Sequence, residues 1–194
     1  ELGKYCSLKL QRSFFPSVDK PMAVEKFVFT NTSAQPIKIE LEYMYRETKT
    51  PVERSSGGQH SFIVSTINDG VKTINAGDSV EFAITYQAAN NKSDFIAPEI
   101  NTEENARRSR VAAMQSHLIL ETPDPVLNTM FAFAKIRATE SIYNTKGGLM
   151  HGPGGLRYYA AIWANDQAEY VNPFFAFLGD DIAVKSAMNA YRMF

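Results

Sequence analysis

The stretch DPVLNTMFAFAKIRATESIYN, residues 124–144, marks the point at which the chain changes its hydrophobic period. Asp124 can cap the start of a helix, and Pro125 suits the first helical position. Apolar residues then follow at helical spacing and share one face: Leu127, Phe131, Ala134, Ala138 and Ile142. We therefore expect a helix over these residues.

Two more helices are expected after this one. The second begins near Asp166 and ends at Gly179, with a kink or a short turn at Pro173. Asp180 can cap a third helix, so that FLGDD forms a tight joint between the two. These helices carry apolar residues on several faces, which implies that they pack against further helices or against another copy of the chain.

Residues 1–90 show instead the period of two that is typical of strands. In PIKIELEYMYR (36–46) apolar residues alternate with Lys and Glu, and SVEFAITYQA (79–88) repeats the pattern. NDG (68–70) predicts a hairpin turn between SFIVSTI and VKTI. ETKTPVERSSGGQH (47–60) is expected to be a long polar loop. Such short strands, separated by turns, suggest an antiparallel β-sandwich.

The predicted fold class is therefore α+β: a β-sandwich over 1–90, a linker with a helix over 91–123, and αα-hairpins over 124–194. In the linker, NTEENARRSRVAAMQ predicts a helix with Thr102 as its N-cap. Three arginines of this helix could contact phosphate, but without further basic residues they indicate a solvated face or a packing surface: Arg107, Arg108 and Arg110.

Composition excludes several classes of protein. The chain has 20 basic and 21 acidic residues and a net charge of −1, which gives no basic surface for nucleic acid. No apolar run is long enough to span a membrane. Cys6 is the only cysteine, so an intramolecular disulfide is excluded, and its place in a strand suggests a small core residue.

Residues 144–165 form a connection of about twenty residues, whereas packed helices are usually joined by about 2–8. Its glycines and aromatic residues favour an ordered wall of a binding site. Trp163 and Tyr158 can stack on a sugar or close a helix end as core aromatics. Arg157 can bind a carboxylate or sugar hydroxyls, or form a structural ion pair. His151 is a ligand contact or a structural residue. A metal site is not expected here, because no second His or Cys lies nearby in the sequence.

Asp166 and Glu169 are the best pair of chemical groups. At a spacing of three they share a face of an α-helix, and glycosidases need two carboxylates. The same spacing at a helix start also resembles a capping box. We therefore expect Asp166 to hold a sugar and Glu169 to cap the helix, and no catalytic acid or base is assigned.

Two segments, LILETPDPVLNTMFAFAKI and GGLMHGPGG followed by IWANDQAEYVNPFFAFLGD, carry a family resemblance. After a β-sandwich and a linker helix, they resemble the six-hairpin (α/α)6 glycoside hydrolases, which include α-L-rhamnosidases and glucoamylases, and most of all the rhamnosidase-like enzymes of Bacteroidetes. The resemblance maps a Trp-x-x-Asp motif onto Trp163 and Asp166, whose carboxylate would hold sugar hydroxyls. Glucoamylase-like members have Arg where this chain has Asn165. The Asp-Glu-Arg motif of the general acid is absent upstream of Trp163, so the acid is expected beyond Phe194.

The resemblance implies hydrolysis of glycosidic bonds in oligo- or polysaccharides by carboxylate acid/base catalysis, without a cofactor, in the bacterial periplasm or outside the cell. The expected partners are a carbohydrate and the rest of the toroid, and the 194-residue chain is expected to be inactive alone. Six residues are the candidates for substrate binding: Trp163, Asp166, Asn165, Arg157, His151 and Tyr158. Two alternatives stay open: a non-catalytic carbohydrate-binding module, and an interaction protein that dimerises through its helical hairpin.

Overall fold

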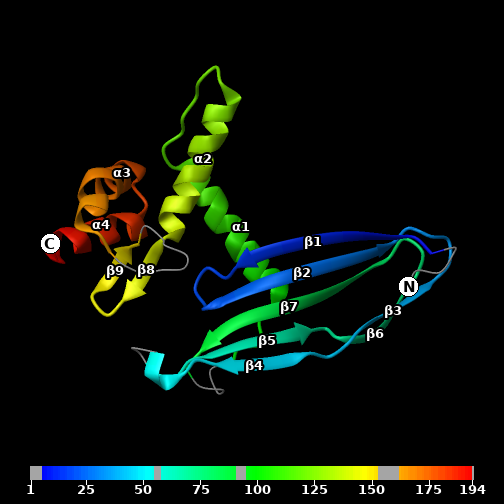
Figure 1. Cartoon of the computed structure of the whole chain (residues 1–194). Helices are drawn as coiled ribbons and strands as arrows, with labels where there is room; N and C mark the ends of the chain where they lie inside the picture. The colour runs from blue at the N-terminus through cyan, green and yellow to red at the C-terminus, as the bar shows by residue number, and fades with distance from the viewer. Residues whose placement is uncertain (1–5, 55–57, 91–94, 153–161, 194) are drawn as a thin grey trace. The chain divides into compact units, whose positions relative to one another are not determined.

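The computed structural model describes residues 6–54, 58–90, 95–152 and 162–193. They form an α+β fold that divides into two compact units, Glu1–Arg108 and Ser109–Phe194 (Figure 1). The first unit contains β1 (Leu8–Pro16), β2 (Met22–Asn31), β3 (Ile37–Leu41), β4 (Tyr45–Lys49), η1 (Val52–Arg54), β5 (Ser61–Ile67), β6 (Gly70–Ile74) and β7 (Ser79–Ala89). Helix α1 (Ile100–Ser116) runs from the first unit into the second. The second unit contains α2 (Pro125–Glu140), β8 (Ile142–Thr145), β9 (Gly148–His151), η3 (Asp166–Val171), α3 (Asn172–Leu178) and α4 (Asp181–Met193).

The strands of the first unit form an antiparallel sheet with the order β1-β2-β7-β5-β4, and β3 pairs separately with β6. In the large sheet, Phe27 of β2 lies opposite Arg12 of β1 and Phe82 of β7. Both segments with a period of two contain strands: β3 and the start of β4 in 36–46, and β7 in 79–88. Their antiparallel pairing confirms the all-antiparallel character expected for residues 1–90.

The segment 36–46 does not form the single strand that its alternation predicts. The strand conformation stops between β3 and β4, and the two halves pair with different partners: Ile37 lies opposite Ile74, and Tyr45 lies opposite Ser65. The NDG turn is also not a hairpin turn. Asn68 and Gly70 have the positive φ values of 60° and 94° that a tight turn needs, but the turn joins β5 to β6, which belong to different sheets.

Three other local predictions for the first unit are wrong. The polar segment 47–60 is not all loop, because β4 extends to Lys49 and η1 follows it. Helix α1 begins at Ile100, whose side chain packs in the core, so Thr102 lies inside the first turn rather than at the cap. Cys6 is exposed and is not a core residue.

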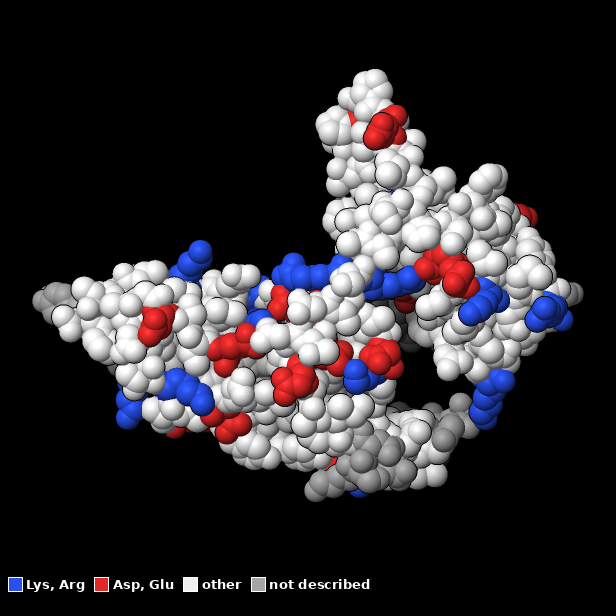
Figure 2. Space-filling model, turned by 180° about the vertical axis from the view of Figure 1, so that it is seen from behind, with Lys and Arg blue, Asp and Glu red and all other residues white. Residues whose placement is uncertain are grey.

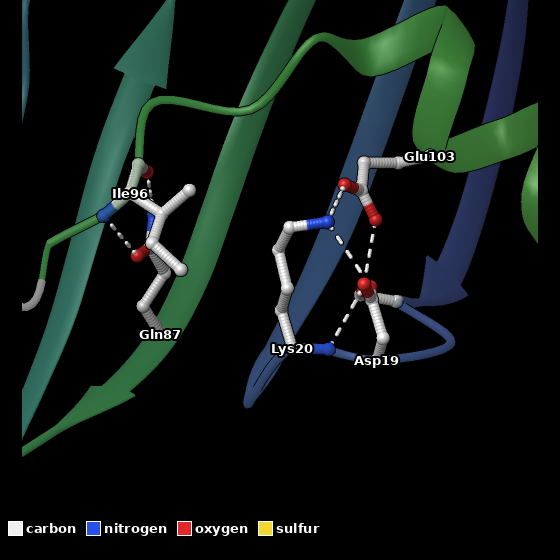
Figure 3. Close-up of polar contacts among 6 residues, drawn as sticks. Asp19, Lys20, Gln87, Ile96 and Glu103 are labelled. Atoms are coloured by element: carbon white, nitrogen blue, oxygen red, sulfur yellow. Dashed lines mark hydrogen bonds and ion pairs between the residues drawn. The ribbon is translucent and has the colours of Figure 1, made fainter.

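The first turns of helix α1 pack against the large sheet. The core there contains Phe15, Met22, Val24, Ala83 and Ile100. Lys26 of β2 donates to Asn101 over 2.6 Å and pairs with Glu104 over 2.9 Å. Figure 3 shows a second ion pair, between Lys20 and Glu103, with a separation of 2.6 Å. Charged side chains of the first helical turns therefore fix α1 on the sheet around an apolar centre.

The backbone that leads into α1 is also fixed to the sheet. The side chain of Gln87, on β7, donates to the carbonyl oxygen of Ile96 over 2.6 Å and accepts from the Ile96 N–H over 3.0 Å (Figure 3). A buried carboxamide thus satisfies both polar groups of one residue, much as a neighbouring strand would.

In the second unit, the predicted start of α2 is confirmed. Asp124 accepts from the N–H groups of Val126 and Leu127, and Pro125 occupies the first turn. The helix ends at Glu140, however, so Ile142 belongs to β8. Its buried side chains also differ from the prediction: Leu127 and Ala134 are exposed, whereas Lys135 and Thr139 are buried.

The predicted joint between α3 and α4 is confirmed. Gly179 ends α3 with a φ of 69°, and the Asp180 carboxylate accepts from the Ala183 N–H over 3.0 Å.

Asp180 also pairs with Arg110 of α1 over 2.6 Å. Arg108 is exposed and pairs with Glu104, one turn earlier in α1. The interpretation of these two arginines as parts of a solvated face and a packing surface is therefore confirmed.

Candidate functional site

The segment predicted to be a long loop contains a β-hairpin. Strands β8 and β9 pair antiparallel, and the Thr145 hydroxyl donates to the Gly148 carbonyl across the turn. Gly148 has a φ of 99°, which favours glycine at this position of the turn. Asn189 of α4 donates to the carbonyl oxygens of Gly147 and Leu149, so the hairpin is fixed to α4 (Figure 1).

The hairpin ends at His151, one of the predicted sugar-binding residues. Its side chain is buried, with 7% exposed, and its ring meets the edge of Phe175 at a centroid distance of 5.7 Å. Burial lowers the pKa of His151, while the negative charge of Asp166 opposes this shift. The structure therefore favours a neutral imidazole that forms part of the protein interior.

Trp163, Asn165 and Asp166 lie together where the next helical segment begins. Residues 164–165 already have helical conformation, and the N–H of Gln167 donates to the Trp163 carbonyl over 3.1 Å. Trp163 is 47% exposed, Asn165 is exposed, and Asp166 is half-buried. An aromatic surface and a carboxylate thus occupy one short stretch at the surface of the second unit.

Arg157 and Tyr158, the other two candidates for substrate binding, lie outside the described residues. Their predicted role in binding a carbohydrate stays a prediction.

The helix that starts here is not a regular α-helix. Residues Asp166–Val171 form a π-helical turn, in which the Asn172 N–H donates to the carbonyl of Gln167, five residues earlier. Pro173 follows immediately and has no N–H to continue an α-helical pattern. The interruption expected at Pro173 therefore takes the form of a π turn in front of α3. Such turns are frequent at functional sites.

The π turn changes the relationship between Asp166 and Glu169. Its wider turn means that residues three apart no longer line up as they do in an α-helix. Glu169 is exposed, whereas Asp166 is half-buried, and the Asn165 side chain makes no capping hydrogen bond to the π turn. Because the helix begins before Asp166, the predicted capping box is wrong, and the two carboxylates do not share one environment.

Gln167 is a site residue that the sequence did not suggest. It is 1% exposed and donates from Nε2 to the His151 carbonyl oxygen over 2.7 Å. This bond joins the end of the β-hairpin to the π turn. Only a tertiary contact reveals it, since a Gln between Asp and Ala has no distinctive sequence signal.

An exposed aromatic ring and a half-buried carboxylate are groups that can bind a polar ligand. Within the described ranges, no group of three His, Cys, Asp or Glu residues is placed to hold a metal ion. A shallow apolar hollow lies elsewhere, at the start of α2, lined by Pro125, Val126, Thr129 and Met130. It has no titratable side chain, so we keep the Trp163–Asp166 stretch as the candidate site.

None of the helices in the described part of the chain is both long and apolar enough to cross a membrane. No protein-family model matches the chain, and no curated protein sequence matches it.

Proposed function

We propose that this chain is the N-terminal β-sandwich and the first helical hairpins of a six-hairpin (α/α)6 glycoside hydrolase, in which Trp163 and Asp166 bind the sugar. The observation that supports this most is the pairing of an exposed indole with a half-buried carboxylate at the start of one helical segment. Sugars present both C–H faces and hydroxyl groups, which fit an aromatic ring and a carboxylate respectively.

The fold supports the same proposal. A five-stranded antiparallel sheet, together with the β3–β6 pair, would supply the sandwich. Helices α3 and α4 form a tight hairpin, which is the repeating unit of such a toroid. Apolar side chains on the helices remain exposed, among them Val126, Met130 and Phe133 of α2. On the side that Figure 2 shows, few charged side chains lie over α2, as expected for a helix that further helices would cover.

The test uses the full-length protein and a panel of 4-nitrophenyl glycosides. A hydrogen bond from a sugar hydroxyl to a charged carboxylate contributes about 1.5–3 kcal/mol. Asp166→Ala is therefore expected to lower kcat/KM for the best substrate by about tenfold or more. Asp181→Ala is the matched control, because Asp181 is an exposed acid in the first turn of α4.

Three results would contradict the proposal or a part of it. Absence of hydrolysis across the panel would exclude the enzyme, and binding of the same sugars without hydrolysis would favour the carbohydrate-binding module. An equal effect of the two substitutions would instead exclude Asp166 as the sugar ligand.

A further inference from the structure

A charged side chain lies within an apolar row at the edge of the large sheet. Leu10, Arg12 and Phe14 alternate along β1, the edge strand, so their side chains share one face (Figure 1). Phe15, which packs with Ile100 at the start of α1, points to the opposite face. Leu10 is 52% exposed and Phe14 is 63% exposed. The row therefore presents apolar surface to solvent on the face that points away from the start of α1.

The arginine in this row is held by a buried carboxylate. Arg12 Nε donates to Glu25 on the neighbouring strand β2, and the Tyr86 hydroxyl on β7 donates to the other oxygen of Glu25 over 2.7 Å. The Phe14 ring meets the edge of Tyr86 at a centroid distance of 6.0 Å, and Phe14 lies opposite Glu25 in the strand register. These contacts join the four side chains into one cluster across three adjacent strands, which we call the Arg12 cluster.

The Arg12 cluster leaves part of the guanidinium open. Nε is bonded to Glu25, whereas Nη1 and Nη2 have no hydrogen-bond partner among the described residues. The Arg12 side chain is 63% exposed, so a ligand in solution can reach these nitrogens. Both oxygens of Glu25 already accept a hydrogen bond, and Glu25 is 6% exposed. The polar group that the cluster exposes most is therefore a positively charged hydrogen-bond donor.

A buried carboxylate on an apolar face calls for an explanation. Glu25 lies opposite Ile84 of β7, and a buried ion pair is often no more stable than apolar side chains of similar volume. The bond from Nε restricts the Arg12 side chain before any ligand arrives. A ligand then has less side-chain freedom to remove, and this lowers the free-energy cost of binding.

The open groups determine which ligand fits. A guanidinium can donate two parallel N–H bonds to one carboxylate, which is the geometry that distinguishes it from an ammonium group. Beside it, the exposed ring of Phe14 offers an apolar surface on which the C–H face of a sugar ring can pack. A uronic acid carries both a carboxylate and a sugar ring. Its negative charge also complements the positive charge of Arg12.

We propose that Arg12 and Phe14 bind a uronic acid residue of an acidic polysaccharide, with the carboxylate on Nη1 and Nη2 and the sugar ring on the Phe14 ring. The inference rests on the proposed function for the choice of a carbohydrate. It assigns a second binding site to the first unit, whereas Trp163 and Asp166 belong to the second.

The test measures binding of tetragalacturonate to the full-length protein by isothermal titration calorimetry, with its methyl ester as the matched uncharged ligand. Arg12→Lys is expected to weaken binding of tetragalacturonate by about tenfold or more, because lysine keeps a charge for Glu25 but lacks the fork of donors. Phe14→Ala is expected to weaken it by about three- to tenfold. Arg46→Lys is the matched control, because Arg46 is exposed on β4, the opposite edge strand, where it donates to a backbone carbonyl.

Three results would overturn the inference. The first is equal affinity for tetragalacturonate and its methyl ester, or no binding of either. The second is unchanged affinity in Phe14→Ala, a variant that leaves the pair of Arg12 and Glu25 intact. The third is tighter binding of tetraglutamate, which would assign the Arg12 cluster to an acidic peptide.

The proposed function is tested separately from this inference. Arg12→Lys is expected to leave hydrolysis of 4-nitrophenyl glycosides unchanged, and Asp166→Ala is expected to leave the affinity for tetragalacturonate unchanged. A protein that binds tetragalacturonate through Arg12 but hydrolyses no glycoside overturns the enzyme and leaves the inference standing. Loss of tetragalacturonate binding in Asp166→Ala but not in Arg12→Lys overturns the inference alone.

Discussion

The ammonium nitrogen of Lys135, on α2, lies 2.8 Å from the carbonyl oxygen of Gln115, in the last turn of α1. The same nitrogen donates to the carbonyls of His117 over 2.5 Å and Leu118 over 3.3 Å. Lys135 is 2% exposed, and burial lowers its pKa. All three donors of one buried cation therefore satisfy backbone oxygens at the end of a helix, where intrahelical partners are missing.

We expect Lys135→Met to destabilise the protein strongly. Methionine keeps the apolar stem but leaves three carbonyl oxygens without this donor, and loss of a buried, hydrogen-bonded charge costs about 3 kcal/mol or more. The free energy of unfolding in urea measures the effect. Lys185→Met is the control, because Lys185 is exposed on α4. Equal stability of the two variants would show that the Lys135 contacts contribute nothing.

Asp180 gives a second prediction, which concerns acid stability. Burial alone would raise the pKa of Asp180, but the hydrogen bonds from Arg110 and from the Ala183 N–H lower it overall. A lowered carboxyl pKa stabilises the fold above the unfolded value near 3.8, and this contribution disappears as the pH falls below it.

Asp180→Asn keeps an oxygen for the Ala183 N–H but removes the charge that pairs with Arg110. We expect a loss of about 1.5–3 kcal/mol at neutral pH, since hydrogen bonds to charged groups contribute about that much. The difference from the unmodified protein should narrow as the pH falls toward 3. Urea unfolding at several pH values measures both effects, and a difference that does not depend on pH would contradict the ion pair as its source.

Local signals in the sequence identified two helix boundaries, although Thr102 was wrongly predicted as the cap of α1. Asp124 and Pro125 mark the start of α2, and Gly179 and Asp180 mark the joint before α4, because capping depends on residues within one turn. The same local reasoning placed Trp163, Asn165 and Asp166 together at the start of one helical segment.

Features that depend on distant partners were not predictable. The alternation over 36–46 continues without a break, yet β3 and β4 separate because Ile74 and Ser65 lie in different sheets. A lysine in a helix is normally expected to face solvent, but the ammonium group of Lys135 is buried because it bonds to the end of α1. The burial of Gln167 likewise depends on a distant partner, the His151 carbonyl at the end of β9.

His151 gives a third prediction, for mildly acidic pH. Its pKa is lowered by burial, with Asp166 acting in the opposite direction. The unfolded chain, with a His pKa near 6.5, therefore binds a proton more readily than the folded chain. The contribution of His151 to the free energy of unfolding is therefore complete above pH 6.5, and it falls as the pH decreases below 6.5.

We expect His151→Gln to reduce the loss of melting temperature between pH 7.5 and pH 5.5. The comparison with the unmodified protein removes the contributions of carboxyl groups that both proteins share. His60→Gln, in the first unit, is the control and should keep the full pH dependence. If the melting temperatures of the two variants change with pH to the same extent, the burial of His151 does not govern the pH dependence of stability between pH 7.5 and pH 5.5.

The exposed apolar stripe of α2 gives the last prediction. Val126, Met130 and Phe133 follow one another at helical spacing and are more than half exposed, at 74%, 61% and 63%. A contiguous apolar surface of this kind tends to associate with another protein surface. We expect the 194-residue chain to self-associate as its concentration rises in sedimentation velocity experiments, and Met130→Glu with Phe133→Glu to reduce this. Tyr43→Glu, at an exposed aromatic residue of the first unit, should leave the association unchanged. A chain that stays monomeric at all concentrations would show that the exposed stripe does not drive association. That result would also weaken the proposal that further helices pack on it.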